Sequence, residues 1–352
     1  MERTALLLTD KFLPQPGGSQ LYLGRVYQHL QGTRASVLTR SAPGAEAFDR
    51  TYPLPVRRLP FINVPKARMP LLWAGLFAGA ALRVLARSTR EIHCGQVLET
   101  GISGWLLRRS SGCPYCLFTY GEELQVYGRT PVGRRWLSRV LGGALAIVTI
   151  SRASREMLLS LGAAEEKVTI AYPGVDTPRA AIPADALRRK HGLGDGPVLL
   201  TVGRLTERKG QDTVIRALPQ LAREYPGIRY VVAGQGPYQS HLRRLADEAS
   251  VADRVLFLTG VSDGERGALY AACDLFVMPN RRLANGDTEG FGIVFLEAGL
   301  AGRAVIAGRD GGAPEAMEDG VTGVLADGAS AEGVAEAVLS LLRDPERRRA
   351  MG

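Results

Sequence analysis

Short apolar runs alternate with longer amphipathic segments along almost the whole chain. In the first half, the runs expected to form strands are residues 5–9, 36–39, 91–94, 115–119 and 146–150. In the second half, they are residues 198–202, 230–233, 255–258, 275–278, 304–307 and 323–325. Strands that alternate with helices form a parallel sheet with helices on both faces, and such sheets bind ligands beyond the carboxyl ends of their strands. The pattern therefore predicts an α/β fold.

A segment rich in proline, alanine and aspartate, residues 172–197, interrupts this alternation. A chain of 352 residues also exceeds the length at which a single hydrophobic core usually keeps growing. We therefore expect two Rossmann-like, doubly wound domains that face each other across a cleft. The N-terminal, acceptor-binding domain is expected over residues 1–171 and the C-terminal, donor-binding domain over residues 198–352. Residues 172–197 would supply the linker and the first helix of the second domain.

The net charge of +9 is unevenly distributed. Through Ala171 there are 22 lysines and arginines against 11 acidic residues, a net charge of +11, and the remainder has 22 against 24, a net charge of −2. A basic half indicates contact with something anionic, such as a membrane surface, a phosphorylated acceptor or nucleic acid. Solvated arginines on an ordinary surface explain the excess equally well. We expect no nucleic-acid partner, because the chain has no recognisable nucleic-acid-binding module.

Several features favour a cytoplasmic protein. The four cysteines are too few and too scattered for a disulfide framework, and the first apolar run is too short for a signal peptide. Residues 69–86 are almost wholly apolar, but Arg83 lies within them, so we expect a buried or interface-seeking helix that does not span a membrane. Cys113 and Cys116 form a glutaredoxin-like C-x-x-C motif. They lead into a strand, whereas redox cysteines open a helix, so redox chemistry is disfavoured.

A group of cations follows the strand at 198–202. Gly203 and Arg204 come first, and Lys209 precedes the next expected helix. Arginine can bind a phosphate through two parallel hydrogen bonds, and lysine supplies a point charge. The loop could therefore hold a phosphate, although surface cations in a strand–helix loop are an equally good explanation.

The segment 286–301 gives a stronger indication. Glu289 and two glycines precede an apolar helix that contains Glu297. The glycines let the backbone approach a ligand, and the free N–H groups of a helix start can hold a diphosphate. The two carboxylates could accept hydrogen bonds from sugar and ribose hydroxyls. Alternatively, Glu297 could be a core carboxylate paired with a cation.

A glycine loop, with Gly17 and Gly18, also follows the first strand and precedes a helix. It lacks the spacing G-x-G-x-x-G of dinucleotide-binding sites, so the sequence does not favour a dehydrogenase. The two glycines could contact phosphate or form a plain turn.

Together these motifs resemble the family-4 retaining glycosyltransferases, which have the GT-B fold. The resemblance is most specific in E-G-F-G-I-V-F-L-E at residues 289–297. It extends to G-R-L-T-E-R-K-G at 203–210, V-V-A-G-Q-G-P at 231–237, Y-P-G-V-D at 172–176 and G-G-A-P-E at 311–315. It implies transfer of a hexose-type sugar from a GDP- or UDP-sugar to a hydroxyl acceptor, which could be lipid-linked or a small molecule.

The resemblance also implies roles for individual residues. Arg204, Lys209 and Glu289 would be catalytic, with the two cations neutralising the diphosphate. The donor would contact Gly18, Gly203, Gly234, Gly236, Val261, Gly290, Phe291, Gly292, Ile293 and Glu297. Retention without an obvious protein nucleophile suggests attack from the face on which the departing phosphate stays. With only four histidines and no D-x-D beside the donor segment, we expect no metal and no cofactor.

The chain departs from the family pattern at two places. Where the family commonly has His-Gly and an acidic residue, this sequence has Tyr120, Gly121, Glu122 and Glu123, so sugar or acceptor binding by Tyr120 and Glu123 is a less direct transfer. Similar proteins usually end in a helix that crosses back to the first domain, and we expect either a short native protein or a truncated chain here. A GT-B epimerase or hydrolase of sugar nucleotides is the alternative function. Association with the cytoplasmic face of a membrane through the basic domain is a further expectation. The arginine-rich segment 129–139 could lie at the membrane surface, with Trp136 and Leu137 inserted and its arginines over the headgroups, although a packed surface helix with solvated arginines is an equally good explanation.

Overall fold

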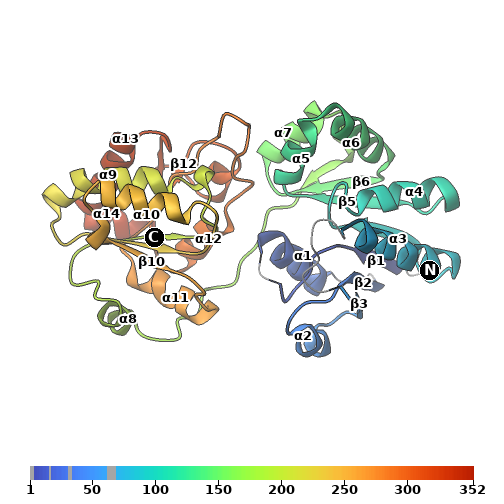
Figure 1. The fold of residues 1–352 in the computed structure, drawn as a ribbon, viewed down its shortest axis with the longest axis horizontal. Coiled ribbons are helices and arrows are strands. Elements are labelled where there is room, and N and C mark those ends of the chain that lie inside the picture. Colours follow the sequence, from blue (N-terminus) through green and yellow to red (C-terminus); the bar gives the residue numbers. More distant parts are fainter. Residues whose placement is uncertain (1–3, 16, 31–33, 62–68) are drawn as a thin grey trace. The chain divides into compact units, whose positions relative to one another are not determined.

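The structure, a computed structural model, describes residues 4–15, 17–30, 34–61 and 69–352. The chain divides into two compact units, Met1–Gly174 and Val175–Gly352, each an α/β domain built on one parallel sheet (Figure 1). The predicted fold class, two doubly wound parallel domains, is confirmed. The first unit extends to Gly174, whereas the sequence predicted a first domain that ends at residue 171.

The first unit contains a seven-stranded parallel sheet in the order β3-β2-β1-β4-β5-β6-β7. Its strands are β1 (Thr4–Leu8), β2 (Arg34–Arg40), β3 (Val56–Leu59), β4 (Glu91–Cys94), β5 (Tyr115–Thr119), β6 (Ala146–Thr149) and β7 (Val168–Ile170). The strand order reverses between β1 and β4, and the loops that leave adjacent strands on the two sides of such a point separate to form a ligand-binding crevice. A ligand site is therefore expected at the loops after β1, β4 and β5.

Seven helices are described in this unit. They are α1 (Gly18–His29), α2 (Ala45–Thr51), α3 (Met69–Leu85), α4 (Gly101–Ser111), α5 (Glu122–Gly128), α6 (Pro131–Gly143) and α7 (Arg152–Ser160). Helix α4 packs between α3 and α6 on the face of the sheet that carries Ile92 and Cys94. Side chains alternate between the faces of a strand, so His93 points to the other face, where it meets Tyr27 of α1.

Helix α3 is the apolar segment predicted from the sequence. It buries Leu72, Leu76 and Ala80, which recur at every fourth position and so share one stripe of the helix. Leu82 and Leu85 are 68% and 75% exposed on the same helix. Among the described residues, no helix is both long and apolar enough to cross a membrane.

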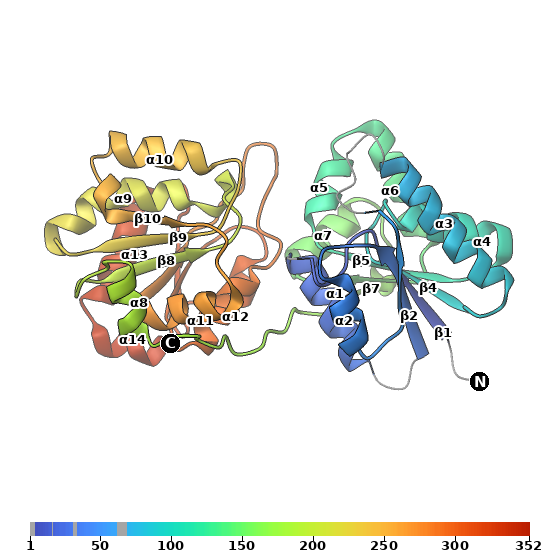
Figure 2. The ribbon, with the colours of Figure 1, turned by 60° about the horizontal axis from the view of Figure 1, so that its bottom comes forward.

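The second unit contains a six-stranded parallel sheet in the order β10-β9-β8-β11-β12-β13. Its strands are β8 (Val198–Val202), β9 (Arg229–Ala233), β10 (Val255–Leu258), β11 (Leu275–Met278), β12 (Val305–Gly308) and β13 (Gly323–Ala326). Its helices are α8 (Ala184–Lys190), α9 (Gln211–Glu224), α10 (Gln239–Glu248), α11 (Asp263–Ala272), α12 (Ile293–Leu300), α13 (Ala331–Leu342) and α14 (Pro345–Met351). Figure 2 shows α9 and α10 on one side of this sheet and α8 and α11 on the other. Here the strand order reverses between β8 and β11.

Every strand predicted from the sequence is present, within two residues of its predicted ends. Two strands were not predicted, β3 and β7, and both are edge strands of the first sheet. Helix α8 lies within the predicted linker and packs on α11, so it belongs to the second unit.

Candidate functional site

In the second unit, the loops after β8 and β11 bring a lysine and a glutamate into direct contact. The Nζ of Lys209 lies 2.5 Å from the Oε2 of Glu289, and each side chain is only 10% exposed. The Nε of Arg208 lies 4.0 Å from the same carboxylate oxygen. Burial alone would raise the pKa of the Glu289 carboxyl, but Lys209 and Arg208 outweigh it and hold that pKa below its usual value. The site thus contains a buried carboxylate that is ionised and flanked by two cations.

The second predicted carboxylate, Glu297, lies on the first turns of α12 and is buried. Its Oε2 accepts a hydrogen bond of 2.7 Å from the hydroxyl of Tyr270, and its Oε1 lies 3.6 Å from a guanidinium nitrogen of Arg266. Both partners come from α11. Tyr270 fixes one carboxylate oxygen, and so presents the other towards Arg266, which is one-third exposed.

Two predicted glycines, Gly290 and Gly292, lie just before α12, and the structure requires glycine at position 292. Gly292 has φ of +88°, and a Cβ there would lie 2.6 Å from the ring of Phe295, so only glycine fits. Gly292 leads into α12, whose N-terminus has no side-chain cap. No side chain of the described residues caps the first N–H groups of this helix, which is the arrangement expected at a helix start that binds an anion. Phe291 is buried, and Gly290 is half-buried before it.

The remaining predicted glycines pack backbone against backbone. A Cβ on Gly234 would lie 1.9 Å from the carbonyl oxygen of Gly203, and a Cβ on Gly236 would lie 2.1 Å from that of Leu205. The loops after β8 and β9 are therefore in contact along their main chains. At the same edge, a Cβ on Gly203 would lie 3.9 Å from the Nζ of Lys209, so this glycine loop adjoins the ion pair.

Two further predicted residues of the second unit are less buried than the ion pair. Arg204 is exposed, whereas Arg208, which the sequence did not single out, is the arginine beside Glu289. Val261 is half-buried in the loop between β10 and α11. In the first unit, Gly18 is exposed at the start of α1.

The predicted acceptor residues lie after β5. The backbone N–H of Tyr120 donates a hydrogen bond of 2.7 Å to the Oε1 of Glu123. Burial raises the pKa of the Glu123 carboxyl to about 7. It also raises the pKa of the Tyr120 hydroxyl well above its usual value, and this hydroxyl is buried without a hydrogen-bond partner within the described part of the chain.

Two carboxylates that the sequence did not single out adjoin these residues. Asp10 follows β1 and Glu99 follows β4. The pKa of the Asp10 carboxyl is raised above its usual value, mainly by burial; the charge of Lys11 opposes this shift and that of Glu99 adds to it. Asp10 is 2% exposed, and its Oδ1 lacks a hydrogen-bond partner among the residues that the structure describes, as does the Oε2 of Glu99. We call Asp10, Glu99, Tyr120 and Glu123 the acidic cluster. It offers buried oxygens that can accept hydrogen bonds from hydroxyl groups.

Comparison with known proteins follows the division into two units. The family described as Glycosyltransferase Family 4 matches residues 16–179, and Glycosyl transferases group 1 matches residues 183–352. The GDP-mannose-dependent alpha-(1-6)-phosphatidylinositol monomannoside mannosyltransferase of Mycobacterium tuberculosis (strain ATCC 25618 / H37Rv) is 37% identical, over 99% of this chain and 91% of that protein. The chain belongs to the family 4 glycosyltransferases. This glycosyltransferase moves a hexose-type sugar from a nucleotide-diphosphate sugar to a hydroxyl acceptor, and the comparisons favour this function over the epimerase and nucleic-acid alternatives.

Two further comparisons extend the similarity. The GDP-mannose-dependent monoacylated alpha-(1-6)-phosphatidylinositol monomannoside mannosyltransferase of Corynebacterium glutamicum is 33% identical, over 99% of this chain and 91% of that relative. The Anabaena protein Alr3699/HepE, solved in complex with UDP and glucose, superimposes with a TM-score of 0.81 at 23% identity, over 99% of this chain and 92% of that one. The fold of this glycosyltransferase is GT-B, as predicted.

Proposed function

We propose that this glycosyltransferase transfers mannose from GDP-mannose to a mannosylated phosphatidylinositol or a closely related glycolipid, with retention of configuration and without a metal ion. The observation that carries the proposal is the similarity, over almost the whole chain, to relatives that are named for this donor and acceptor. The site geometry of each unit supplies groups suited to the two substrates.

The donor site would act through charges that are already in place. Lys209 and the uncapped N-terminus of α12 would stabilise the departing diphosphate, with Arg204 as a third, exposed contact. Glu289 would accept hydrogen bonds from the transferred sugar, and Glu297, fixed by Tyr270, from the ribose. Because these groups neutralise the diphosphate, transfer needs no divalent cation.

The acidic cluster of the first unit would bind the acceptor. Its unpartnered oxygens can accept hydrogen bonds from a polyhydroxy ring such as inositol or mannose. The attacking hydroxyl forms a bond to the anomeric carbon on the face from which the diphosphate leaves. A phosphate oxygen of that diphosphate takes the hydroxyl proton, so the configuration is retained.

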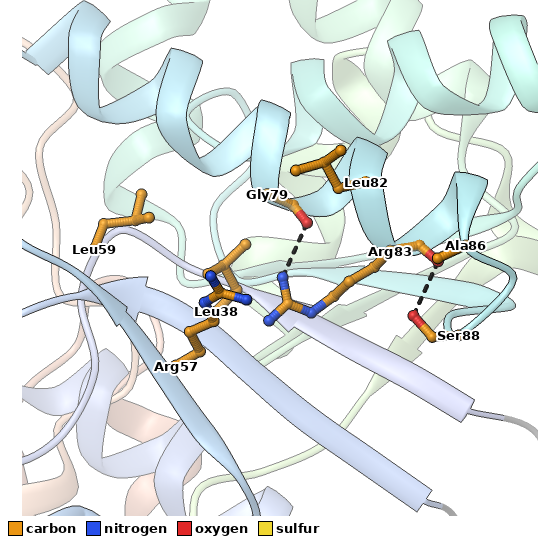
Figure 3. A pocket seen from close by; sticks show the side chains of 8 residues that line it. All are labelled: Leu38, Arg57, Leu59, Gly79, Leu82, Arg83, Ala86 and Ser88. Atoms are coloured by element: carbon orange, nitrogen blue, oxygen red, sulfur yellow. Dashed lines mark hydrogen bonds between the residues drawn. The ribbon is translucent and has the colours of Figure 1, made fainter.

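Membrane association would rest on α3. Leu82 and Leu85 of this helix are exposed, and Leu82 lines a pocket of about 170 Å³ where the guanidinium groups of Arg57 and Arg83 meet apolar side chains (Figure 3). Burial, and then the charge of Arg57, lowers the pKa of the Arg83 guanidinium. Because both arginines line one pocket, an anion bound there would offset their mutual repulsion. Leucines can enter a bilayer while arginines contact anionic headgroups.

The sequence had suggested a different docking helix, the arginine-rich segment at residues 129–139, with Trp136 and Leu137 inserted. Leu137 is fully buried in the core, and Trp136 packs edge-on against Trp105. That prediction is wrong for Leu137, because it is on the core-facing side of α6. Arg135 and Arg139 are exposed on the same helix and would add positive charge to the docking face.

The enzymatic proposal is tested with radiolabelled GDP-mannose and vesicles that contain phosphatidylinositol monomannoside. We expect a lipid-extractable mannoside that α-mannosidase cleaves, and much slower transfer from UDP- and ADP-sugars. Turnover that is the same without acceptor, or a β-linked product, would contradict it.

Docking is tested by cosedimentation with anionic and neutral vesicles. The full-length protein should bind the anionic vesicles, less as salt rises, and Leu82→Asp with Leu85→Asp should reduce binding at least tenfold. Leu300→Asp, at a leucine of α12 that is 48% exposed, is the matched control and should bind as the unaltered protein does. Equal binding by all three proteins would remove α3 from the docking surface.

A further inference from the structure

A compact group of metal-ligating side chains lies in the first unit, apart from the acidic cluster. It consists of Glu91 and His93 of β4 and Cys116 of β5, whose ligand atoms all lie within 4.8 Å of one another. It is the only such group within the described ranges that combines three ligand residues in this way. The C-x-x-C motif drew attention to Cys116, but its partners here are not the other cysteine of that motif.

The parallel pairing of β4 with β5 produces this arrangement. Glu91 and His93 are two residues apart, so both point to the same face of the sheet, and His93 lies directly opposite Cys116 in the register. The Sγ of Cys116 lies 3.1 Å from the Oε1 of Glu91, and the Nε2 of His93 lies 3.2 Å from the same oxygen. Backbone pairing thus fixes the positions of all three side chains.

A tetrahedral zinc ion requires ligand atoms about 3.3–3.8 Å apart, given bond lengths of about 2.0–2.3 Å to oxygen, nitrogen and sulfur. The two measured separations are slightly shorter, so small side-chain rotations suffice to admit the ion. A thiolate and a carboxylate together neutralise a dication, and the neutral imidazole completes three protein ligands. The three side chains are half-buried, which leaves a path for the ion and a fourth position for water.

The second nitrogen of His93 already has a suitable partner. Its Nδ1 is hydrogen-bonded to the hydroxyl of Tyr27, a residue of α1 that is 1% exposed. Metal-bound histidines typically donate their other ring N–H to a fixed oxygen, which sets the tautomer and the ring orientation. Tyr27 can take this role by accepting from Nδ1 once Nε2 is bound to the metal.

From these contacts we infer that Glu91, His93 and Cys116 form a binding site for a thiophilic divalent cation of the zinc class, with Tyr27 as the positioning residue for His93. On binding, the metal–sulfur bond replaces the S–H bond, and the proton leaves to solvent. The site lies towards the amino ends of β4 and β5, whereas the acidic cluster follows their carboxyl ends. The metal would join the two strands to α1 and stabilise the unit, and it would take no part in transfer.

The test is a titration of the untagged, EDTA-treated full-length protein with Co²⁺, whose thiolate complexes absorb in the near ultraviolet. We expect one equivalent to produce the charge-transfer band, Zn²⁺ to abolish it, and Zn²⁺ to raise the Tm of the unaltered protein. Cys116→Ser and His93→Gln should lose the band. Cys113→Ser, at the neighbouring thiol, is the matched control and should keep it.

Tyr27→Phe provides a sharper measurement, because it retains every ligand. The band should remain, and the affinity should fall by about tenfold or more. No band in the unaltered protein, a band that survives Cys116→Ser, or its loss in Cys113→Ser would each overturn the site; unchanged affinity in Tyr27→Phe would overturn the positioning role. Circular dichroism and the fluorescence of the tryptophans, which all belong to the first unit, verify that each variant is folded. If Cys116→Ser does not fold, His93→Gln and the unaltered protein decide. Neither donor nor acceptor is present, so the result is independent of the proposed mannosyl transfer.

Discussion

Replacing Glu123 by glutamine should make the first unit more stable at high pH. Burial raises the pKa of this carboxyl from its usual 4.5 to about 7, so between these values the folded state holds a proton that the unfolded state has lost. Rising pH therefore favours unfolding, and the stabilisation present below pH 4.5 is lost as the pH rises through 7. A shift of about 2.5 units corresponds to about 3 kcal/mol, an upper value because Glu123 is not fully buried. Glutamine can still accept the N–H of Tyr120 but carries no charge.

The chain offers a selective probe for this experiment. All three tryptophans, Trp73, Trp105 and Trp136, belong to the first unit, so urea unfolding followed by tryptophan fluorescence reports that unit alone. Relative to the unaltered protein, Glu123→Gln should differ little at pH 5 and be more stable by up to about 3 kcal/mol at pH 8.

Glu122→Gln is the matched control, because Glu122 is exposed on the same turn of α5. Its unfolding free energy should follow that of the unaltered protein at both pH values. If Glu123→Gln shows the same difference from the unaltered protein at pH 5 as at pH 8, the carboxyl does not titrate in this range and the reasoning fails.

Three further predictions concern the substrates. Lys209→Met should lower kcat/KM for the sugar nucleotide at least about 30-fold, because truncating a buried charged partner costs about 2 kcal/mol or more. The control Lys190→Met, at a lysine in an exposed ion pair, should change kcat/KM less than about threefold. Similar losses in both variants would contradict the donor site. Asp10→Asn should raise the KM for acceptor about tenfold or more and leave the KM for donor unchanged, and the reverse pattern would assign Asp10 to the donor. Transfer should continue in excess EDTA, and loss that Mg²⁺ or Mn²⁺ restores would refute metal independence.

The sequence predicts the fold well because its buried strands are continuous apolar runs. Strands β3 and β7 escape that pattern for different reasons. β3 reads V-R-R-L, and its arginines interrupt the apolar run, while β7 has only three residues. Edge strands are paired on one side only, so they can be short and polar.

The donor segment was predictable, but its partners were not. Motif spacing placed Glu289 and Lys209 in one site, yet it favoured Arg204, whereas Arg208 is the arginine near the carboxylate. The backbone turn at residues 207–209 decides which of neighbouring cations faces inward, and composition does not encode that turn. The roles proposed for individual donor residues stay predictions.

The acidic cluster could not be predicted without knowing the order of the strands in the sheet. Asp10 and Glu99 are far apart in sequence, and they approach each other because β1 and β4 are neighbours in the sheet. Nothing in either local sequence specifies that adjacency. A rule that polar residues directly after buried strands share one edge of the sheet would have identified Asp10.

The backbone contacts between glycines have a consequence for engineering a new donor preference. Since Gly234 and Gly236 press against Gly203 and Leu205, saturation libraries at these glycines should consist mostly of misfolded clones, and one inserted residue would displace two loops together. Gly286 differs, because a Cβ there would meet no atom within 4 Å. Its φ of +84° still favours glycine or asparagine, but the space around it can take added length. Insertions or substitutions meant to change the donor sugar are best made near Gly286, because the surrounding space can accommodate them.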